Sequence, residues 1–134
     1  MFQTQKRVEF RDTDTAGIMH FTGFFGWMEE VEHEALRSVG LSVVIPTDDG
    51  KISWPRVSAN CDFVSPVRFE DNVDIKLRLQ KLGEKSAQYN FEISCDERLI
   101  ATGSLTSVCC LVANQQVESI SIPDWIREKL ENLK

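Results

Sequence analysis

The segment from Phe21 to Val39 constrains the fold more than any other part of the chain. Its apolar residues recur at intervals of three and four, which is the spacing of one face of an α-helix. These residues are Phe21, Phe24, Phe25, Met28, Val31, Ala35, Leu36 and Val39. The spacing predicts a helix of about 17 residues, with Thr22 as its N-cap and Gly40 just past its C-terminal end. The apolar face of such a helix is broad, so another element must cover it.

Most of the remaining chain alternates between apolar and polar residues with the period of two that β-strands show. The expected strands are residues 2–10, 56–64, 73–80, 86–95 and 99–112. Helix- and strand-breaking residues predict loops at 11–20 and 41–51. A short helix, with a capping box formed by Ser121 and Asp124, is expected to close the chain.

The order of these elements is one strand, a long helix, four strands and a short helix. Strands joined by short turns pair antiparallel, and two-sided alternation indicates a sheet with one covered face. Only one long helix is expected to cover that face. The sequence therefore predicts an α+β fold, in which a curved antiparallel sheet wraps around one long central helix. A chain of 134 residues can bury such a core as a single domain, residues 1–134.

Composition excludes several kinds of partner. The formal net charge is −6, and the 15 Lys and Arg residues are scattered, so we expect no nucleic-acid partner. No apolar stretch approaches the length of about 18 residues that spans a bilayer, and residues 1–10 do not resemble a signal peptide, so the expected location is cytoplasmic. The four Cys and two His lack the spacing of a zinc site, so no metal or other cofactor is expected.

The residues best suited to chemistry lie in the loop that runs into the predicted long helix. This loop carries Asp12 and Asp14, and Gly17 allows its backbone to adopt a positive φ. Free amides at a helix start stabilise developing negative charge. A carboxylate beside such amides can hydrolyse an activated acyl group, either as a nucleophile or as a general base for water. The same pattern also fits ordinary turn and capping chemistry, so the residues alone leave both interpretations open.

Two blocks of sequence carry a resemblance to a known family. They are the run from Val8 to Phe21 (VEFRDTDTAGIMHF) with Phe25, Met28 to Glu30 and Glu32, and the later run from Val57 to Pro66 with Phe69 to Asp71. Together they resemble the 4-hydroxybenzoyl-CoA thioesterase family, a branch of the hotdog-fold acyl-CoA thioesterases, over about residues 2–112. The resemblance implies the hotdog fold and hydrolysis of an acyl-CoA thioester to a carboxylic acid and free CoA.

The resemblance also implies roles for individual residues. Asp14 corresponds to the catalytic carboxylate, as nucleophile or general base. The backbone N–H of Phe21 corresponds to the group that binds the thioester carbonyl at the helix start, and Gly17 holds the loop close. Asp12 is expected to be a structural hydrogen-bond acceptor within the loop.

Three further residues are expected to contact the substrate. His20 takes a position that implies a polar wall of the acyl pocket or a proton shuttle, and a packed loop residue is the alternative. Lys85 is the expected partner of the CoA phosphates, with Arg56 and Arg68 as other local cations, and an ordinary surface lysine is the alternative. Ser58, in the second block, is the third expected contact.

The sequence leaves other functions open. Glu29 or Glu30 on the predicted helix could replace Asp14 as the catalytic carboxylate. A non-hydrolytic module that binds acyl thioesters, or a dehydratase that uses His20 and Glu29, is the main alternative to hydrolysis. The resemblance implies a dimer or tetramer with sites built between protomers. The acyl group, and the choice between CoA and acyl-carrier protein as thiol carrier, are not encoded in any recognisable motif.

Overall fold

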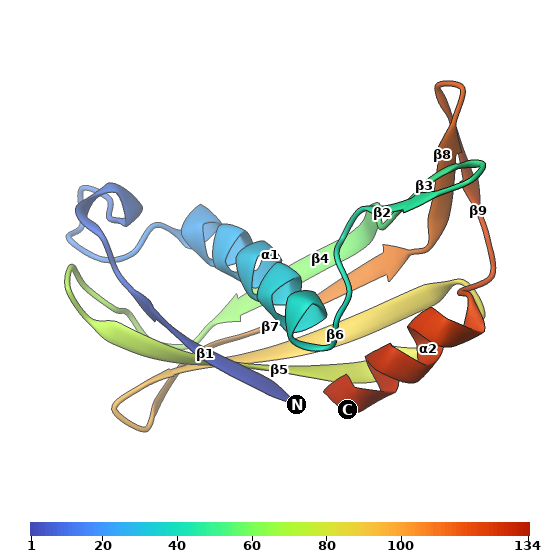
Figure 1. The fold of residues 1–134 in the computed structure, drawn as a ribbon. Coiled ribbons are helices and arrows are strands. Elements are labelled where there is room, and N and C mark those ends of the chain that lie inside the picture. Colours follow the sequence, from blue (N-terminus) through green and yellow to red (C-terminus); the bar gives the residue numbers. More distant parts are fainter.

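Helix α1 (Phe21–Ser38) lies across one face of a curved antiparallel sheet in the computed structural model of residues 1–134 (Figure 1). The nine strands are β1 (Phe2–Arg7), β2 (Ile45–Thr47), β3 (Gly50–Ser53), β4 (Arg56–Phe63), β5 (Asn72–Leu82), β6 (Ser86–Cys95), β7 (Arg98–Val108), β8 (Cys110–Ala113) and β9 (Gln116–Ser119). The shorter helical elements are α2 (Asp124–Leu130) and two 3-10 turns, η1 (Phe10–Asp12) and η2 (Glu131–Leu133). Neither α-helix has both the length and the apolar character needed to cross a membrane.

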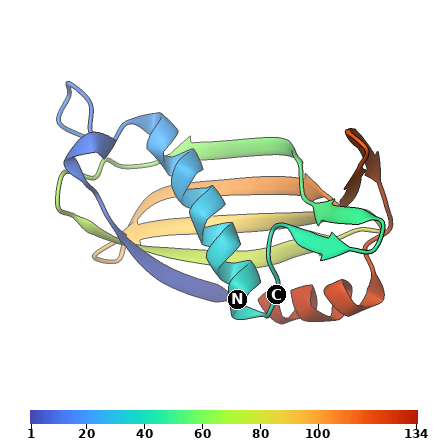
Figure 2. The same ribbon diagram turned by 45° about the horizontal axis from the view of Figure 1, so that its top comes forward.

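The main sheet has five strands in the order β1-β5-β6-β7-β4, and every neighbouring pair is antiparallel. Figure 2 shows α1 running across this sheet. Alternate residues of β5 and β6 are buried beneath the helix, as their apolar–polar alternation predicts. At Gly103 of β7 an added Cβ would meet the sulfur of Met28, so the glycine lets α1 pack directly on the strand. The predicted α+β fold, a sheet wrapped around one long helix, is confirmed.

Strand β4 occupies a position that the order of strands along the chain does not reveal. It pairs with β7 and not with β5, which follows it in sequence. Residues 64–71 form a loop rather than a tight turn, so the chain can cross from one side of the sheet to the other before β5 begins. As a result β1 and β4 are the two edges of the main sheet.

A second, smaller sheet has the order β2-β3-β8-β9 and projects from one end of the molecule (Figure 1). The prediction that residues 41–51 form a loop is therefore wrong in part, because β2 and the start of β3 lie there. The expected strand at 99–112 is two strands, β7 and β8, which meet at Cys109. The backbone of Cys109 leaves the β7 register: its N–H donates to the Lys85 carbonyl and its own carbonyl accepts from Ile120.

The C-terminal end of α1 confirms the role predicted for Gly40. This glycine has φ +77°, and its N–H donates to the Arg37 carbonyl at 3.0 Å. The N–H of Leu41 donates to the Leu36 carbonyl at 2.9 Å. These two hydrogen bonds form a Schellman motif, which needs a residue in the left-handed region at the position of Gly40.

Two predicted helix caps are wrong. The N-cap of α1 is His20 and not Thr22, because the His20 side chain accepts the Thr22 amide. The N-cap of α2 is Pro123, which makes no side-chain cap. The Ser121 hydroxyl instead donates to the Glu84 carboxylate at 2.9 Å, so no capping box forms there.

Candidate active site

Residues 12–20 form a tight hairpin that leads directly into α1. At its base the His20 N–H donates to the Asp12 carbonyl at 2.7 Å. Near its tip the Asp14 N–H donates to the Ile18 carbonyl at 2.9 Å. The Asp12 carboxylate also accepts the N–H of Glu9 at 2.8 Å, which confirms its predicted structural role. The hairpin therefore joins the Asp14 carboxyl and the start of α1 in one compact unit.

Gly17 closes the tip of this hairpin. Its N–H donates to the Asp14 carbonyl at 3.0 Å, and its backbone adopts φ +77°. A Cβ added at Gly17 would meet no atom within 4 Å. The position thus requires glycine for its backbone conformation and not for space.

The Asp14 carboxyl is held at one oxygen and open at the other. Its Oδ1 accepts the Ala16 N–H at 2.8 Å, and its Oδ2 accepts no hydrogen bond from the chain. The side chain lines an open hollow of about 510 Å³. The other residues of this hollow are Phe10, Thr13, Thr15, Gly17 and Phe69. A carboxylate oxygen at the edge of an open, partly apolar hollow can reach an incoming acyl group.

The first amide of α1 is free. The N–H of Phe21 donates to no acceptor in the chain, whereas the next amide, of Thr22, donates to the ring Nδ1 of His20 at 3.2 Å. A helix of 18 residues carries a partial positive charge at this end. The Phe21 amide is therefore available to a carbonyl oxygen that develops negative charge.

His20 is a capping residue in this structure. Its Nδ1 lies 2.7 Å from the Thr22 hydroxyl, and its ring stacks on that of Phe21 with centroids 4.7 Å apart. His20 is not among the residues of the Asp14 hollow. The three roles expected from the sequence, a wall of the acyl pocket, a proton shuttle and a packed loop residue, do not include this hydrogen bond to the helix start.

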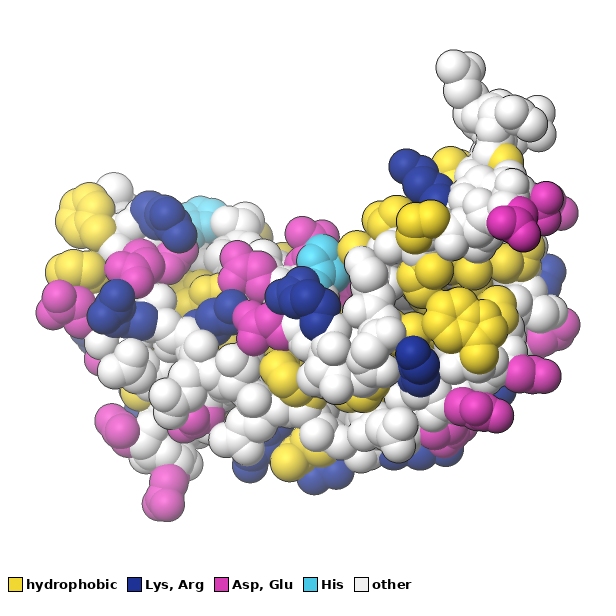
Figure 3. All heavy atoms as spheres, in the orientation of Figure 1, with side chains coloured by type: hydrophobic (Ala, Val, Ile, Leu, Met, Phe, Trp, Pro, Cys, Tyr) yellow, Lys and Arg dark blue, Asp and Glu magenta, His cyan; other side chains and the backbone are white.

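An aromatic cluster surrounds the start of α1. The ring of Phe63, at the end of β4, contacts Phe21 and Phe24 with centroid distances of 6.3 and 5.5 Å. Phe21 and Phe63 remain about half exposed. Figure 3 shows hydrophobic side chains reaching the surface at this end of the molecule, on the left of the view. An exposed apolar surface beside the free amide suits an acyl chain or a second protein surface.

Lys85 and Ser58 lie away from Asp14 in a single chain. Phe69 of the Asp14 hollow precedes β5, whereas Lys85 follows the other end of this strand of 11 residues. At the rise of a β-strand the two ends lie about 30 Å apart. Ser58 is exposed on β4 and pairs with Thr106. Neither Lys85 nor Ser58 therefore lines the Asp14 hollow of the same chain.

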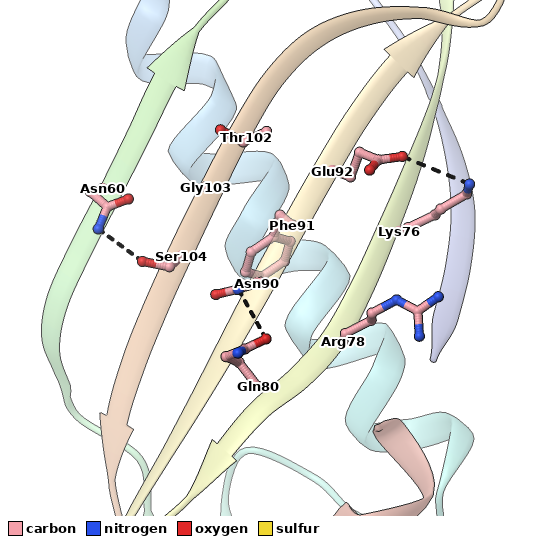
Figure 4. Close-up of a pocket in the computed structure, with 10 residues that line it drawn as sticks. All are labelled: Asn60, Lys76, Arg78, Gln80, Asn90, Phe91, Glu92, Thr102, Gly103 and Ser104. Atoms are coloured by element: carbon pink, nitrogen blue, oxygen red, sulfur yellow. Dashed lines mark hydrogen bonds and ion pairs between the residues drawn. The ribbon is translucent and has the colours of Figure 1, made fainter.

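Ser58 belongs to the sheet face opposite α1. Two residues further along β4, Asn60 lines a polar hollow of about 500 Å³ on that face (Figure 4). Its hydrogen bonds join neighbouring strands, Asn60 to Ser104 at 2.8 Å and Asn90 to Gln80 at 3.2 Å. This hollow holds no nucleophile beside a free amide, and its polar lining is that of a solvated sheet face.

A buried ion pair in the middle of α1 was not predicted from the sequence. Glu32 is 1% exposed, and its Oε1 accepts a hydrogen bond from Arg56 Nη2 at 2.8 Å. Arg56 also donates to the Trp54 carbonyl at 3.1 Å and lies 3.2 Å from His33 Nε2. Its guanidinium is therefore occupied, which argues against its predicted contact with CoA. The sequence did contain a signal for the burial of Glu32, because this residue lies four residues after Met28, on the apolar stripe of α1.

Burial dominates the electrostatics of this cluster. Loss of solvent raises the pKa of Glu32 to about 7, although the charge of Arg56 opposes the rise. Burial and the charge of Arg56 lower the pKa of His33, and burial together with Glu32 raises the pKa of Tyr89. Glu32 Oε2 and the buried hydroxyl of Ser107, whose backbone pairs with Arg56, have no hydrogen-bond partner.

The alternative carboxylates on α1 do not resemble the Asp14 site. Glu30 forms an ion pair with Lys6 at 3.1 Å, and Glu29 is exposed on the helix. No group of three or more His, Cys, Asp or Glu side chains is arranged to hold a metal ion. Asp14 thus supplies a free carboxylate oxygen on the hairpin, and Phe21, directly after the hairpin, supplies a free helix-start amide.

The sequence is similar to a family of known proteins. The sequence model of the thioesterase-like superfamily matches residues 8–130. A 1,4-dihydroxy-2-naphthoyl-CoA hydrolase from Prochlorococcus marinus (strain MIT 9313) is 34% identical, over 92% of this chain and 85% of the relative. Another, from Synechococcus sp. (strain CC9605), is 31% identical over 96% and 89%. The solved structure of a gentisyl-coenzyme A thioesterase has 32% identity and a TM-score of 0.82, covering 96% of this chain and 99% of that chain.

Proposed function

The chain belongs to the thioesterase-like superfamily and hydrolyses acyl-CoA thioesters, and we propose that Asp14 and the Phe21 amide carry out this reaction. The thioester carbonyl accepts a hydrogen bond from the Phe21 N–H. The partial positive charge at the start of α1 then stabilises the oxyanion that forms. The observation that carries this proposal is the hairpin, which presents an open carboxylate oxygen and leads directly into the free helix-start amide.

Asp14 can act by two routes. As a nucleophile, its carboxylate oxygen bonds to the acyl carbon, the C–S bond breaks, and a mixed anhydride is left for water to hydrolyse. As a general base, it takes a proton from the attacking water, and that proton passes to the departing thiolate. Either route consumes one water and yields a carboxylic acid and free CoA. Both use groups of the chain alone, so we propose that the reaction needs no metal or other cofactor.

The proposed substrate class is an aryl-CoA. The relatives described above are named for naphthoyl and gentisyl thioesters, in which an aromatic ring is bonded to the acyl carbon. Exposed aromatic side chains lie on both sides of the hairpin in this structure, Phe10 and Phe69 in the Asp14 hollow and Phe21 and Phe63 at the helix start. Such rings suit a planar acyl group.

We further propose that two copies of the chain join along β4 as a dimer, the unit from which a tetramer would be built. β4 is an edge strand of eight residues with most side chains exposed, and its outer backbone groups pair with no strand. Such an edge is a template for pairing with another strand. A copy joined there would lie beside Phe63 and the start of α1. It could also bring its Lys85 or Ser58 toward Asp14, as the prediction for these residues requires.

The direct test is thiol release from a panel of acyl-CoAs. We expect steady release of CoA, with one equivalent of carboxylic acid, and a higher kcat/KM for benzoyl-CoA than for hexanoyl-CoA. Added chelator should leave the rate unchanged. Binding of acyl-CoA without thiol release would contradict hydrolysis, and release that stops on metal removal would contradict the cofactor-free route.

A further inference from the structure

Phe10 and Phe69 form an exposed aromatic notch beside Asp14. Their ring centroids are 6.0 Å apart and their planes are perpendicular, which is an edge-to-face contact. The side chain of Phe10 is 77% exposed and that of Phe69 49%. Both rings line the same hollow as the Asp14 carboxyl and Gly17. The notch therefore places two aromatic rings next to the group that attacks the thioester or activates water.

The fold leaves these two rings outside its hydrophobic core. Phe10 lies in η1, directly after β1, and Phe69 lies in the loop before β5. Neither side chain belongs to the buried core, and each leaves much of its surface in water. Exposed aromatic surface beside a polar functional group is typical of ligand sites, where a few polar groups orient a molecule held by apolar contacts.

The chemistry of an acyl-CoA decides which part of it can reach the notch. In an aryl-CoA the aromatic ring is bonded directly to the carbonyl carbon, so it must lie next to Asp14 when that carbon does. The adenine ring is separated from the same carbon by the whole pantetheine and diphosphate arm. A ring in the Asp14 hollow is therefore the acyl ring whenever the thioester is placed for reaction.

Resting on the function proposed above, we infer that the Phe10–Phe69 notch binds the aromatic ring of the acyl group and makes the enzyme prefer aryl- over alkyl-CoA. The edge-to-face arrangement of the two rings leaves ring faces and edges for a third aromatic ring, an arrangement that favours aromatic over aliphatic partners. Pairing of two copies along β4 would leave the notch open, because Phe10 follows β1 at the opposite edge of the sheet.

The test replaces each ring by a branched aliphatic side chain. Phe69→Leu and Phe10→Leu keep an apolar group but remove the ring. Each should lower the ratio of kcat/KM for benzoyl-CoA to that for hexanoyl-CoA about three- to tenfold. The matched control is Trp125→Leu, which removes a similarly exposed ring on α2 (47% exposed) and should leave the ratio unchanged. An unchanged ratio in both notch variants would overturn the inference.

Two further measurements separate the notch from the adenine and from catalysis. If the notch bound adenine, Phe69→Leu would raise KM for both CoA substrates and leave benzoyl-pantetheine, which lacks adenine, unaffected; that pattern would overturn the inference. Affinities of the wild type and Phe69→Leu for benzyl-CoA and hexyl-CoA thioethers, which cannot be hydrolysed, test the notch without turnover. If Phe69→Leu weakens binding of the benzyl thioether but not of the hexyl thioether, the notch is supported even if no thioester is hydrolysed. If the wild type and the variant bind the benzyl thioether with equal affinity, the inference is contradicted.

Discussion

Asp14 lies near the tip of a surface hairpin, with one carboxylate oxygen facing an open hollow, whereas Glu32 lies on the buried face of α1 with 1% of its surface exposed. Asp14 is held by a backbone amide, and Glu32 is held by the guanidinium of Arg56. The hairpin that carries Asp14 leads directly into the free amide of Phe21, whereas Glu32 is buried and lines no open hollow. The two carboxylates thus differ in their access to a substrate.

The open and the buried carboxylate therefore have different roles in this small fold. The open carboxylate can meet a reacting group because a glycine-bearing turn presents it at the surface. The buried carboxylate instead links the middle of α1 to the first residue of β4, and the last residue of that strand, Phe63, contacts the start of α1. We therefore expect changes at Asp14 to affect turnover and changes at Glu32 or Arg56 to affect stability. The following predictions test this division.

Removal of Arg56 should have the largest effect on stability. Arg56→Met leaves the buried Glu32 carboxylate without its cation, and breaking a buried pair in this way costs about 3 kcal/mol. The free energy of unfolding in urea at pH 8 measures the loss. Because Glu32 can take up a proton, the loss should shrink at pH 5. A variant as stable as the wild type at pH 8 would show that the pair does not fix β4 to α1.

Glu32→Gln should change how stability depends on pH. Burial raises the pKa of Glu32 from 4.5 to about 7, so the folded chain holds a proton that the unfolded chain releases between these values. Wild-type stability should therefore fall by on the order of 2 kcal/mol as pH rises from about 4.5 through 7, relative to the variant. The comparison isolates Glu32, because His33 is present in both proteins. If the unfolding free energies of the wild type and Glu32→Gln change in parallel from pH 4.5 to 8, the raised pKa of Glu32 is contradicted.

Gly17→Ala should have the smallest effect. The added methyl group meets no neighbour, so the cost comes from the positive φ alone and is about 1 kcal/mol. Gly26→Ala is the matched control, since its added Cβ also meets no neighbour but lies within α1, where alanine favours the helix. Thermal unfolding should show a lower Tm for the first variant and a higher Tm for the second. Equal shifts would mean that Gly17 is not needed for the turn.

Regular elements of the fold were predictable from sequence because their patterns are local. The alternation in β6 predicts its range, and the apolar spacing of α1 predicts its position. The small sheet escaped prediction because β2 and β3 have three and four residues, too few to show alternation, and β3 pairs with the distant β8. The placement of β4 beside β7 is equally non-local.

The candidate site, too, could be predicted from the sequence only in part. A recognisable motif marks Asp14 and Gly17, so both could be named before their geometry was known. The cap formed by His20 could not, because histidine is not among the usual N-cap residues. Glu32 follows an acidic pattern that is typical of a solvated helix face, yet its place on the apolar stripe already put it in the core. Burial of a charge depends on a partner from another element, here Arg56.

The most direct test of the account is the kcat of Asp14→Asn with benzoyl-CoA, measured beside Asp48→Asn, the same substitution at an exposed turn between β2 and β3. We expect kcat of the Asp14 variant to fall by about 10²–10⁴-fold with its free energy of unfolding unchanged, while the Asp48 variant keeps wild-type activity. An Asp14 variant that is folded and retains most of the wild-type kcat would contradict the account.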